Sequence, residues 1–413
     1  MNLGELIAKY DIPGAQVAVL DDGEIHDEAA GVLSTHTQVE TTTDSVFKTG
    51  SITKIWTATL VRQLVAEGAL DLDQPVRSYL PGFQLKDHEA TNTITARHLL
   101  THTSGIAPNH FTDTGQNADA IEKFVATLAD EEHLLPPGTL HSYSNTGFTV
   151  LGRLVEVLRG RHFHDVLRER LITPLGLKAI ATDTYEALLH RTAVGHVKTT
   201  PTTKWAISYK TTPSGSHLAM SAHELLTFVH HHLTDPTLAA LREHQVDVPD
   251  FGGGVTSWGL GWMRYPGGVL GHTGVSKGQK AFLRVDPSAN RAVAVLTNST
   301  NGDPLAHEVF TATGFDPTPI PTPPANPVPI DDRMCGTYRN PLYDITLTST
   351  SLTYRPRNDL AASFRGTTPV EVVRLNDDSI ITTGTHEVMS LIGSDEAGRA
   401  KYLHNGGAAY RIA

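Results

Sequence analysis

The order of strand-like and helix-like segments is the feature that most limits how this 413-residue chain can fold. A buried-strand pattern at 12–20 is followed by Asp22-Gly23, a pair typical of a hairpin turn. The region of about 85–205 is mainly helical, and strand patterns return only later, at 258–262, 268–272, 280–285 and 292–297. This order predicts an α+β fold, in which one antiparallel sheet is flanked by helices and carries an inserted all-helical subdomain.

A second composition begins near residue 316. Residues 316–329 contain seven prolines, which predicts a stiff, extended linker. Residues 330–413 then have an all-β pattern, with short strands and with turns at 376–378 and 405–407. The sequence therefore predicts a domain over 1–315, a proline-rich linker over 316–329, and a small all-β barrel or sandwich over 330–413.

Charge and cysteine content restrict the partners and the compartment. With 33 Lys and Arg against 44 Asp and Glu, the net charge is −11, which argues against nucleic acid or an anionic membrane as partner. Cys335 is the single cysteine, so the chain has no intrachain disulfide and no cysteine-based metal cluster. Neither a signal peptide nor a membrane-spanning window is visible, so we expect a cytoplasmic protein.

A possible nucleophile lies at the start of a predicted buried helix. Ser51 and Lys54 are three residues apart, and therefore on one face of that helix, which ends at Gly68. The helix dipole favours an oxyanion at Ser51, and a neighbouring amine helps to remove its proton. Taken alone, Ser-x-x-Lys is a weak motif, and a serine at a helix start is often only an N-cap.

Two further motifs support the catalytic interpretation. Tyr143-Ser144-Asn145 directly precedes a predicted helix at 146–159, and His272-Thr273-Gly274 ends a predicted strand. Tyr338-Arg339-Asn340 repeats the first pattern, but it lies beyond the proline-rich segment and is rejected. The dense cluster His230–His232 is not expected to bind metal, because adjacent side chains point in different directions.

The three motifs, in this order, resemble those of the serine β-lactamase-related family of class C type, which includes esterases, D-aminopeptidases, DD-peptidases and acyltransferases. The resemblance covers about residues 10–315. Supporting stretches are Leu70–Asp73, Leu99–Ile106, Pro174–Leu177 and Trp258–Trp262.

The resemblance implies a role for each motif residue. Ser51 is the nucleophile of an acyl-enzyme, and Lys54 and Tyr143 form one proton-transfer unit in which either could be the base. An ammonium beside the phenol would lower the pKa of Tyr143, and desolvation would lower that of Lys54. The backbone N–H groups of Ser51 and Val275 form the oxyanion hole.

The resemblance also assigns substrate contacts and a structural residue. Asn145, His272, Thr273 and Gly274 are expected to bind substrate, and His102 is expected to hold its loop through hydrogen bonds. Neither a metal nor a cofactor is implied.

One departure from the family's pattern directs the expected function. β-Lactamases and DD-peptidases usually carry lysine at the position of His272, and that cation pairs with a substrate carboxylate. We therefore expect a serine hydrolase of small esters or amides, with its acylation machinery complete by about residue 315. One alternative is a transacylase that passes the acyl group to an amine or alcohol in natural-product biosynthesis, such as that of antibiotics. A second alternative is an inactive binding protein with the same fold.

Overall fold

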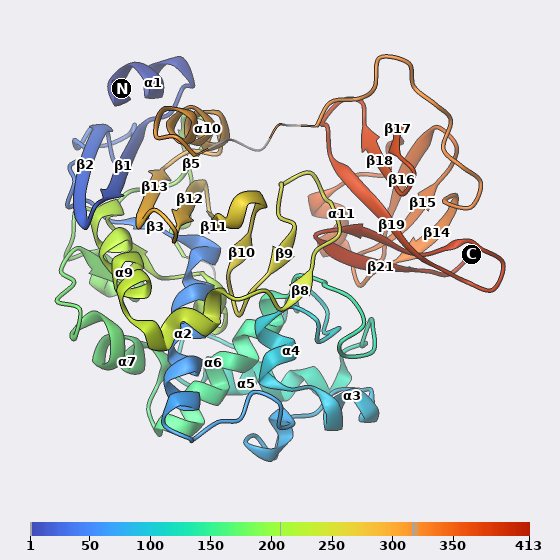
Figure 1. Cartoon of the computed structure of the whole chain (residues 1–413), viewed down its shortest axis with the longest axis horizontal. Helices are drawn as coiled ribbons and strands as arrows, with labels where there is room; N and C mark the ends of the chain where they lie inside the picture. Colours follow the sequence, from blue (N-terminus) through green and yellow to red (C-terminus); the bar gives the residue numbers. More distant parts are fainter. Residues whose placement is uncertain (1, 207, 316–318, 320) are drawn as a thin grey trace.

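An eight-stranded antiparallel sheet organises the larger of two lobes in the computed structural model, which describes residues 2–206, 208–315, 319 and 321–413 (Figure 1). The strand order is β2-β1-β13-β12-β11-β10-β9-β8. The bounds are β1 Gly14–Asp21, β2 Glu24–Gly31, β8 Val246–Asp247, β9 Ser257–Trp258, β10 Met263–Arg264, β11 Leu270–Ser276, β12 Gln279–Asp286 and β13 Arg291–Thr297. The predicted pairing of early and late strands is confirmed, because β1 lies against β13 with Ala15 opposite Thr297.

The expected single strand over 258–262 is wrong. Trp258 ends β9 and Met263 begins β10, and these two residues pair across a tight turn. Gly261 within that turn has φ +84°, a conformation that few residues other than glycine adopt. The aromatic pattern therefore marks a hairpin, because the glycines reverse the chain between its two tryptophans.

Helices cover both faces of the sheet (Figure 1). On one face, α1 (Leu3–Lys9) and α10 (Gly302–Ala312) bury an apolar cluster against β1, β12 and β13. On the other face lie α9 (Ala222–Thr234) and α2 (Thr53–Ala66). Helix α2 is buried on nearly all sides, and Trp56 stacks on Phe228 at 3.8 Å between ring centroids. A helix surrounded by apolar side chains is held rigidly, which suits a helix that carries reactive groups.

The region between α2 and the later strands is mainly helical, as predicted. Its helices are α3 His88–Thr93, α4 Ala96–Leu100, α5 Ala120–Ala126, α6 Asn145–Arg159, α7 Phe163–Leu167 and α8 Thr184–Ala187. Two small sheets lie beside them: β3 Phe47–Lys48, β7 Ala219–Met220 and β4 Ile180–Ala181 in one, and β5 His196–Val197 and β6 Thr200–Pro201 in the other. Helix α6 begins directly after the Tyr143 motif and ends at Gly160 in the left-handed conformation.

The smaller lobe is a closed eight-stranded barrel in which β14 to β21 follow one another in chain order. The strands are β14 Gly336–Arg339, β15 Tyr343–Leu347, β16 Ser351–Pro356, β17 Val370–Asn376, β18 Ser379–Thr382, β19 Val388–Ser394, β20 Ala400–Asn405 and β21 Gly407–Arg411, with α11 Asp359–Phe364 between β16 and β17. Of the predicted linker, residues 316–318 and 320 lie outside the described residues, and 321–330 has no regular structure.

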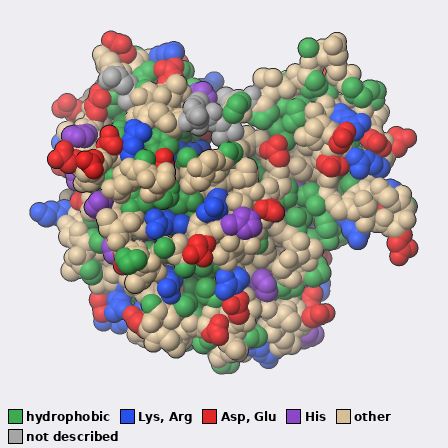
Figure 2. Space-filling view, in the orientation of Figure 1, with side chains coloured by type: hydrophobic (Ala, Val, Ile, Leu, Met, Phe, Trp, Pro, Cys, Tyr) green, Lys and Arg blue, Asp and Glu red, His purple; other side chains and the backbone are tan. Residues whose placement is uncertain are grey.

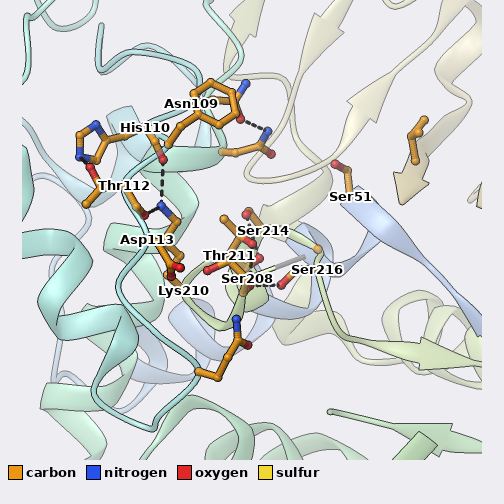
Figure 3. A pocket seen from close by; sticks show the side chains of 15 residues that line it. Ser51, Asn109, His110, Thr112, Asp113, Ser208, Lys210, Thr211, Ser214 and Ser216 are labelled. Atoms are coloured by element: carbon orange, nitrogen blue, oxygen red, sulfur yellow. Dashed lines mark hydrogen bonds between the residues drawn. The ribbon is translucent and has the colours of Figure 1, made fainter. Parts of the chain in front are cut away.

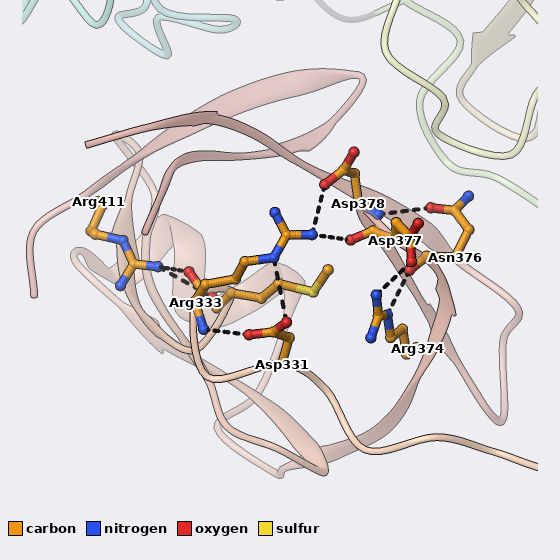
Figure 4. Close-up of polar contacts among 8 residues, drawn as sticks. Asp331, Arg333, Arg374, Asn376, Asp377, Asp378 and Arg411 are labelled. Atoms are coloured by element: carbon orange, nitrogen blue, oxygen red, sulfur yellow. Dashed lines mark hydrogen bonds and ion pairs between the residues drawn. The ribbon is translucent and has the colours of Figure 1, made fainter. Parts of the chain in front are cut away.

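A polar network fixes the chain where it enters the barrel (Figure 4). The Arg333 guanidinium donates to the Asp377 carbonyl at 2.6 Å and to the Asp378 carboxylate at 3.0 Å. Arg411, on the last strand, donates to the Arg333 carbonyl at 3.0 Å. These bonds attach both ends of the barrel's chain to its middle part. The barrel also has an apolar core of its own.

The surface carries charges of both signs. Lys and Arg side chains are interspersed with Asp and Glu over the face shown in Figure 2. In the part of the chain that the structure describes, no helix combines the length and the apolar character needed to cross a bilayer.

Buried histidines predict acid-sensitive stability. Burial lowers the pKa of six histidines to about 3 or about 4: His141, His164, His217, His232, His272 and His404. In the unfolded chain their pKa is about 6.5, so unfolding takes up protons below that pH. Stability should be full above about pH 6.5 and should fall as the pH drops toward 4, by about 1.4 kcal/mol per pH unit for each proton taken up.

Urea unfolding midpoints measured between pH 8 and pH 5 check this expectation. Replacing one such histidine by glutamine (His217→Gln) should make the decline shallower. A midpoint that stays constant over this range would contradict it.

Candidate active site

Ser51 lies at the start of the buried helix α2. It occupies a single 3₁₀ turn, Gly50–Ile52, that leads directly into Thr53–Ala66. Gly50 has φ +51°, and this bend directs the chain into the helix. The Ser51 side chain is only partly buried and lines a cavity (Figure 3). Its hydroxyl is therefore accessible to a small molecule and lies at the positive end of a helix.

Lys54 is fully buried, and its amine has three polar partners. Its Nζ lies 3.0 Å from Ser51 Oγ, 2.7 Å from Asn145 Oδ1 and 2.7 Å from the Ser214 carbonyl oxygen. Burial lowers the pKa of Lys54 well below its ordinary value. No ion pair to Lys54 is found among the described residues, so nothing offsets this desolvation.

The three contacts fit either protonation state of Lys54, and burial favours the neutral amine. The oxygens of Asn145 Oδ1 and of the Ser214 carbonyl can only accept, and they take up both N–H bonds of the amine. The lone pair is then left for the Ser51 hydroxyl to donate to. In this state Lys54 is placed to remove the proton of the nucleophile as it attacks.

Tyr143 has the opposite electrostatic tendency. Burial raises the pKa of its phenol above the ordinary value of 10, and the neighbouring Ser51 side chain offsets this only in part. The expectation that an adjacent ammonium lowers the pKa of Tyr143 is therefore not met, because burial of the phenol dominates. Lys54 Nζ lies 4.8 Å from the centroid of the Tyr143 ring, so the two groups remain in contact. A phenol that stays protonated can serve as a proton donor.

The loop that carries Tyr143 is held by His102, as expected. His102 Nδ1 accepts from the Ser144 N–H at 3.0 Å, and the His102 carbonyl accepts from the Ser142 N–H at 2.7 Å. Ser144 Oγ then caps α6 by accepting from the Gly147 N–H at 3.1 Å. Asn145 is the first residue of α6, and its amide nitrogen donates to Asn109 Oδ1 at 2.9 Å.

The backbone around Ser51 and Val275 is unusually close. A Cβ at Gly274 would lie inside contact distance of the Thr49 carbonyl and 3.1 Å from the Ser51 nitrogen, and a Cβ at Gly50 would lie 2.6 Å from the Val275 nitrogen. Because neither glycine has a side chain, the backbone amide groups of Ser51 and Val275 can lie close to each other. The oxyanion hole remains a prediction, and this proximity is what it requires.

The structure places His272 differently from Thr273. Thr273 lines a cavity that includes Ser51, whereas the His272 ring is fully buried. Its Nδ1 bonds the Thr273 carbonyl at 2.7 Å, and the ring packs edge-on against Trp258. Burial lowers the pKa of His272 to about 3, so this position offers no cation near neutral pH. In this structure the His272 side chain packs inside the domain and is not part of the lining of either cavity at Ser51.

Two cavities meet at Ser51 and Val275. The first, of about 330 Å³, is lined mostly by residues that carry hydroxyl, amide or charged groups, although apolar atoms still make up more of its surface, and we call it the polar cavity (Figure 3). Its lining includes Asn109, Asp113, Gln116, Asn145, Ser208, Thr211 and Ser216. The second, of about 540 Å³, lies between the two lobes and is mainly apolar and aromatic. Its lining includes Tyr143, Phe251, Trp258 and Met263 from the large lobe and Tyr343, Tyr354, Met389 and Leu403 from the barrel.

Sequence reasoning missed the segment 208–216 and the barrel wall. Ser214 contributes only a backbone carbonyl, and Gly215 packs against the backbone of Gly50, so neither has a side-chain signal. Lys210 donates to the carbonyls of His110 and Thr112, which fixes the rim of the polar cavity (Figure 3). The barrel wall lies beyond residue 315 and contributes to the lining of the cavity, while the expectation that the acylation machinery is complete by residue 315 stays a prediction.

A buried lysine, a phenol and a serine at a helix start lie together on this α+β fold. The β-lactamase family model matches residues 2–313, and the chain belongs to that family. Penicillin-binding protein 4 of Amycolatopsis lactamdurans is 39% identical over 364 residues, which cover 81% of this chain and 94% of that protein. An unguisins hydrolase of Aspergillus campestris is 30% identical over 181 residues, 42% of this chain and 34% of that protein.

Solved structures resemble both lobes. The crystal structure of SurE has a TM-score of 0.82 and 26% identity, and the match covers 99% of this chain and 97% of SurE. SurE with D-Leu has a TM-score of 0.81 and 27% identity, with the same coverage. A class C β-lactamase from Rhodobacter sphaeroides, at 23% identity and a TM-score of 0.64, matches 75% of this chain and shares the fold.

The opposite pKa shifts of Lys54 and Tyr143 predict a one-sided pH profile for acylation. The rate should rise as Lys54 loses its proton and should then stay level to about pH 10, because Tyr143 remains protonated there. Single-turnover acylation by an activated amide or ester, corrected for spontaneous hydrolysis, measures this profile. A rate that keeps climbing above pH 10 would instead assign the base to the Tyr143 phenolate.

The same two residues should behave as one unit in mutants. Lys54→Ala and Tyr143→Phe should each lower kcat by about 100-fold or more, and the double variant should be little slower than the worse single. Kinetics of the three variants, with circular dichroism as the control for folding, check this. Losses that multiply would show that the two residues act independently of each other.

Proposed function

We propose that this chain is a serine acyl-transfer enzyme that forms an acyl-Ser51 intermediate from an ester or amide and releases the acyl group to water. The observation that carries this proposal is the position of the buried Lys54 amine, whose Nζ lies 3.0 Å from Ser51 Oγ. Lys54 takes the Ser51 proton as Oγ attacks the carbonyl carbon, and the N–H groups of Ser51 and Val275 stabilise the oxyanion.

The position of Tyr143 supports one assignment of roles to the two cavities. Tyr143 lines the cavity between the lobes and Asn145 lines the polar one. The leaving group must depart on the side of its proton donor, so it occupies the cavity between the lobes. The acyl group then occupies the polar cavity, where the Asn145 amide can bond an amide in the acyl chain. The incoming nucleophile enters where the leaving group left.

A peptide-like acyl group ending in a D-residue is the substrate class we infer. SurE, which resembles this chain over both lobes, has been crystallised with D-Leu. An amide-containing acyl chain also suits the many hydroxyl and amide groups of the polar cavity, because these bond a backbone better than they bond a hydrocarbon.

Transfer to an amine is the second candidate. The cavity between the lobes, at about 540 Å³, has room for an organic acceptor as well as for water, and its aromatic lining excludes part of the solvent. Hydrolysis and transfer share the first half-reaction and differ only in what enters this cavity.

Intact-mass analysis tests both candidates. The N-acetylcysteamine thioester of N-acetyl-D-Leu should add an acyl group to the wild-type protein and none to Ser51→Ala, because the variant lacks the attacking oxygen. The L-Leu thioester is the matched control and should react more slowly. Decay of the adduct in buffer measures hydrolysis, and faster decay on adding an amine indicates transfer. Absence of any adduct with activated acyl donors would favour an inactive binding protein.

Turnover of β-lactams should be poor. His272 is buried and neutral, so the cation that would pair with the β-lactam carboxylate is missing at this position. Cephalosporin hydrolysis, followed by absorbance, should be about 100-fold or more slower than turnover of the best ester. Comparable rates would refute this interpretation of His272.

A further inference from the structure

The turn between β20 and β21 of the barrel lies against the loop that carries Tyr143. Three hydrogen bonds join them, one at each of three successive loop residues. The His404 ring nitrogen Nε2 bonds the His141 carbonyl at 2.9 Å, the Ala408 N–H donates to Ser142 Oγ at 3.1 Å, and the Tyr143 N–H donates to the Gly406 carbonyl at 2.8 Å.

The bond at Tyr143 completes the support of this loop. The N–H groups of Ser142 and Ser144 are both bound by His102, within the large lobe. The N–H of Tyr143, between them, is bound by the barrel instead. The backbone of the proton donor is therefore held from two sides, by His102 on one and by the barrel turn on the other.

The hydrogen bond to the His141 carbonyl defines which ring nitrogen of His404 carries the hydrogen, and burial holds the ring in place. A carbonyl only accepts, so Nε2 of His404 carries the hydrogen. Its Nδ1 is buried and has no hydrogen-bond partner, and burial lowers the pKa of His404 to about 4. His404 is fully buried between Phe251 and His141 at this contact. A buried side chain with one good bond and no room to move is a rigid support.

We propose that the β20–β21 turn is a positioning element for Tyr143, so that the barrel takes part in setting the rate of proton transfer and is more than a wall of the cavity. The proposal rests on the proposed role of Tyr143 as proton donor. His404 and Ser142 are positioning residues, because they act through the loop and need not touch the reacting atoms.

Two variants in the full-length chain test the proposal. Ser142→Ala removes the acceptor of the Ala408 N–H, and His404→Ala removes the donor to the His141 carbonyl. Together they should lower kcat for a small activated ester by about tenfold or more and change KM less than about twofold, because small displacements of a catalytic group cost rate rather than binding. His404→Gln keeps an N–H donor at similar reach and should recover most of the rate. Lys401→Ala, on the exposed side of β20, is the matched control and should leave kcat unchanged.

The same pair of changes in a Tyr143→Phe background decides whether the effect passes through Tyr143. There it should cost little further rate, because the group that the turn positions is already absent. A full additional loss in this background, or a normal kcat for the pair in the wild-type background, overturns the proposal. If His404→Ala does not fold, Ser142→Ala alone, in the large lobe, carries the same test. A Tyr143→Phe enzyme as fast as wild type refutes the proposed role of Tyr143, an outcome distinct from failure of the positioning role.

Discussion

The burial of the Lys54 amine is the constraint on which the active site depends. A polar group removed from water costs free energy unless its hydrogen-bonding capacity is met. The three partners of this amine come from three separate segments: Ser51 before α2, Asn145 at the start of α6, and Ser214 in the segment 208–216. None of the three can move alone without leaving a buried atom unpaired. The same desolvation that makes this network necessary also lowers the pKa of Lys54, so the structural support and the availability of the unprotonated amine have one cause.

Tyr143 obeys a different constraint. The Ser51–Lys54 pair is supported within the large lobe, but the loop of Tyr143 is bound on one side by His102 and on the other by Gly406 of the barrel. Base and proton donor are thus held by different parts of the chain. The barrel packs at the short strands β8–β10, next to the cavity that Tyr143 lines, so one contact surface shapes that cavity and supports its proton donor.

What could be predicted from the sequence was local or depended on the order of elements. Ser51 and Lys54 lie one helical turn apart, so their proximity follows from the helix itself, and the β1–β13 pairing follows from the order of strand patterns. Trp258–Trp262 was misassigned because its glycines form a turn. The raised pKa of Tyr143 results from tertiary burial, which no local pattern records. Ser214 and Gly406 contribute only backbone carbonyls, and any residue type would supply those atoms.

The contrast between the two cavities has a consequence for selectivity within the proposed function. Hydroxyl and amide groups line the first cavity, and a site that pairs such groups with its substrate discriminates against ligands that lack the matching group. An apolar, aromatic cavity distinguishes ligands that differ by one methylene group by only about 1–3 kcal/mol. The acyl group should therefore be selected strictly and the leaving or accepting group loosely. An enzyme built in this way selects one end of its substrate closely and tolerates variety at the other.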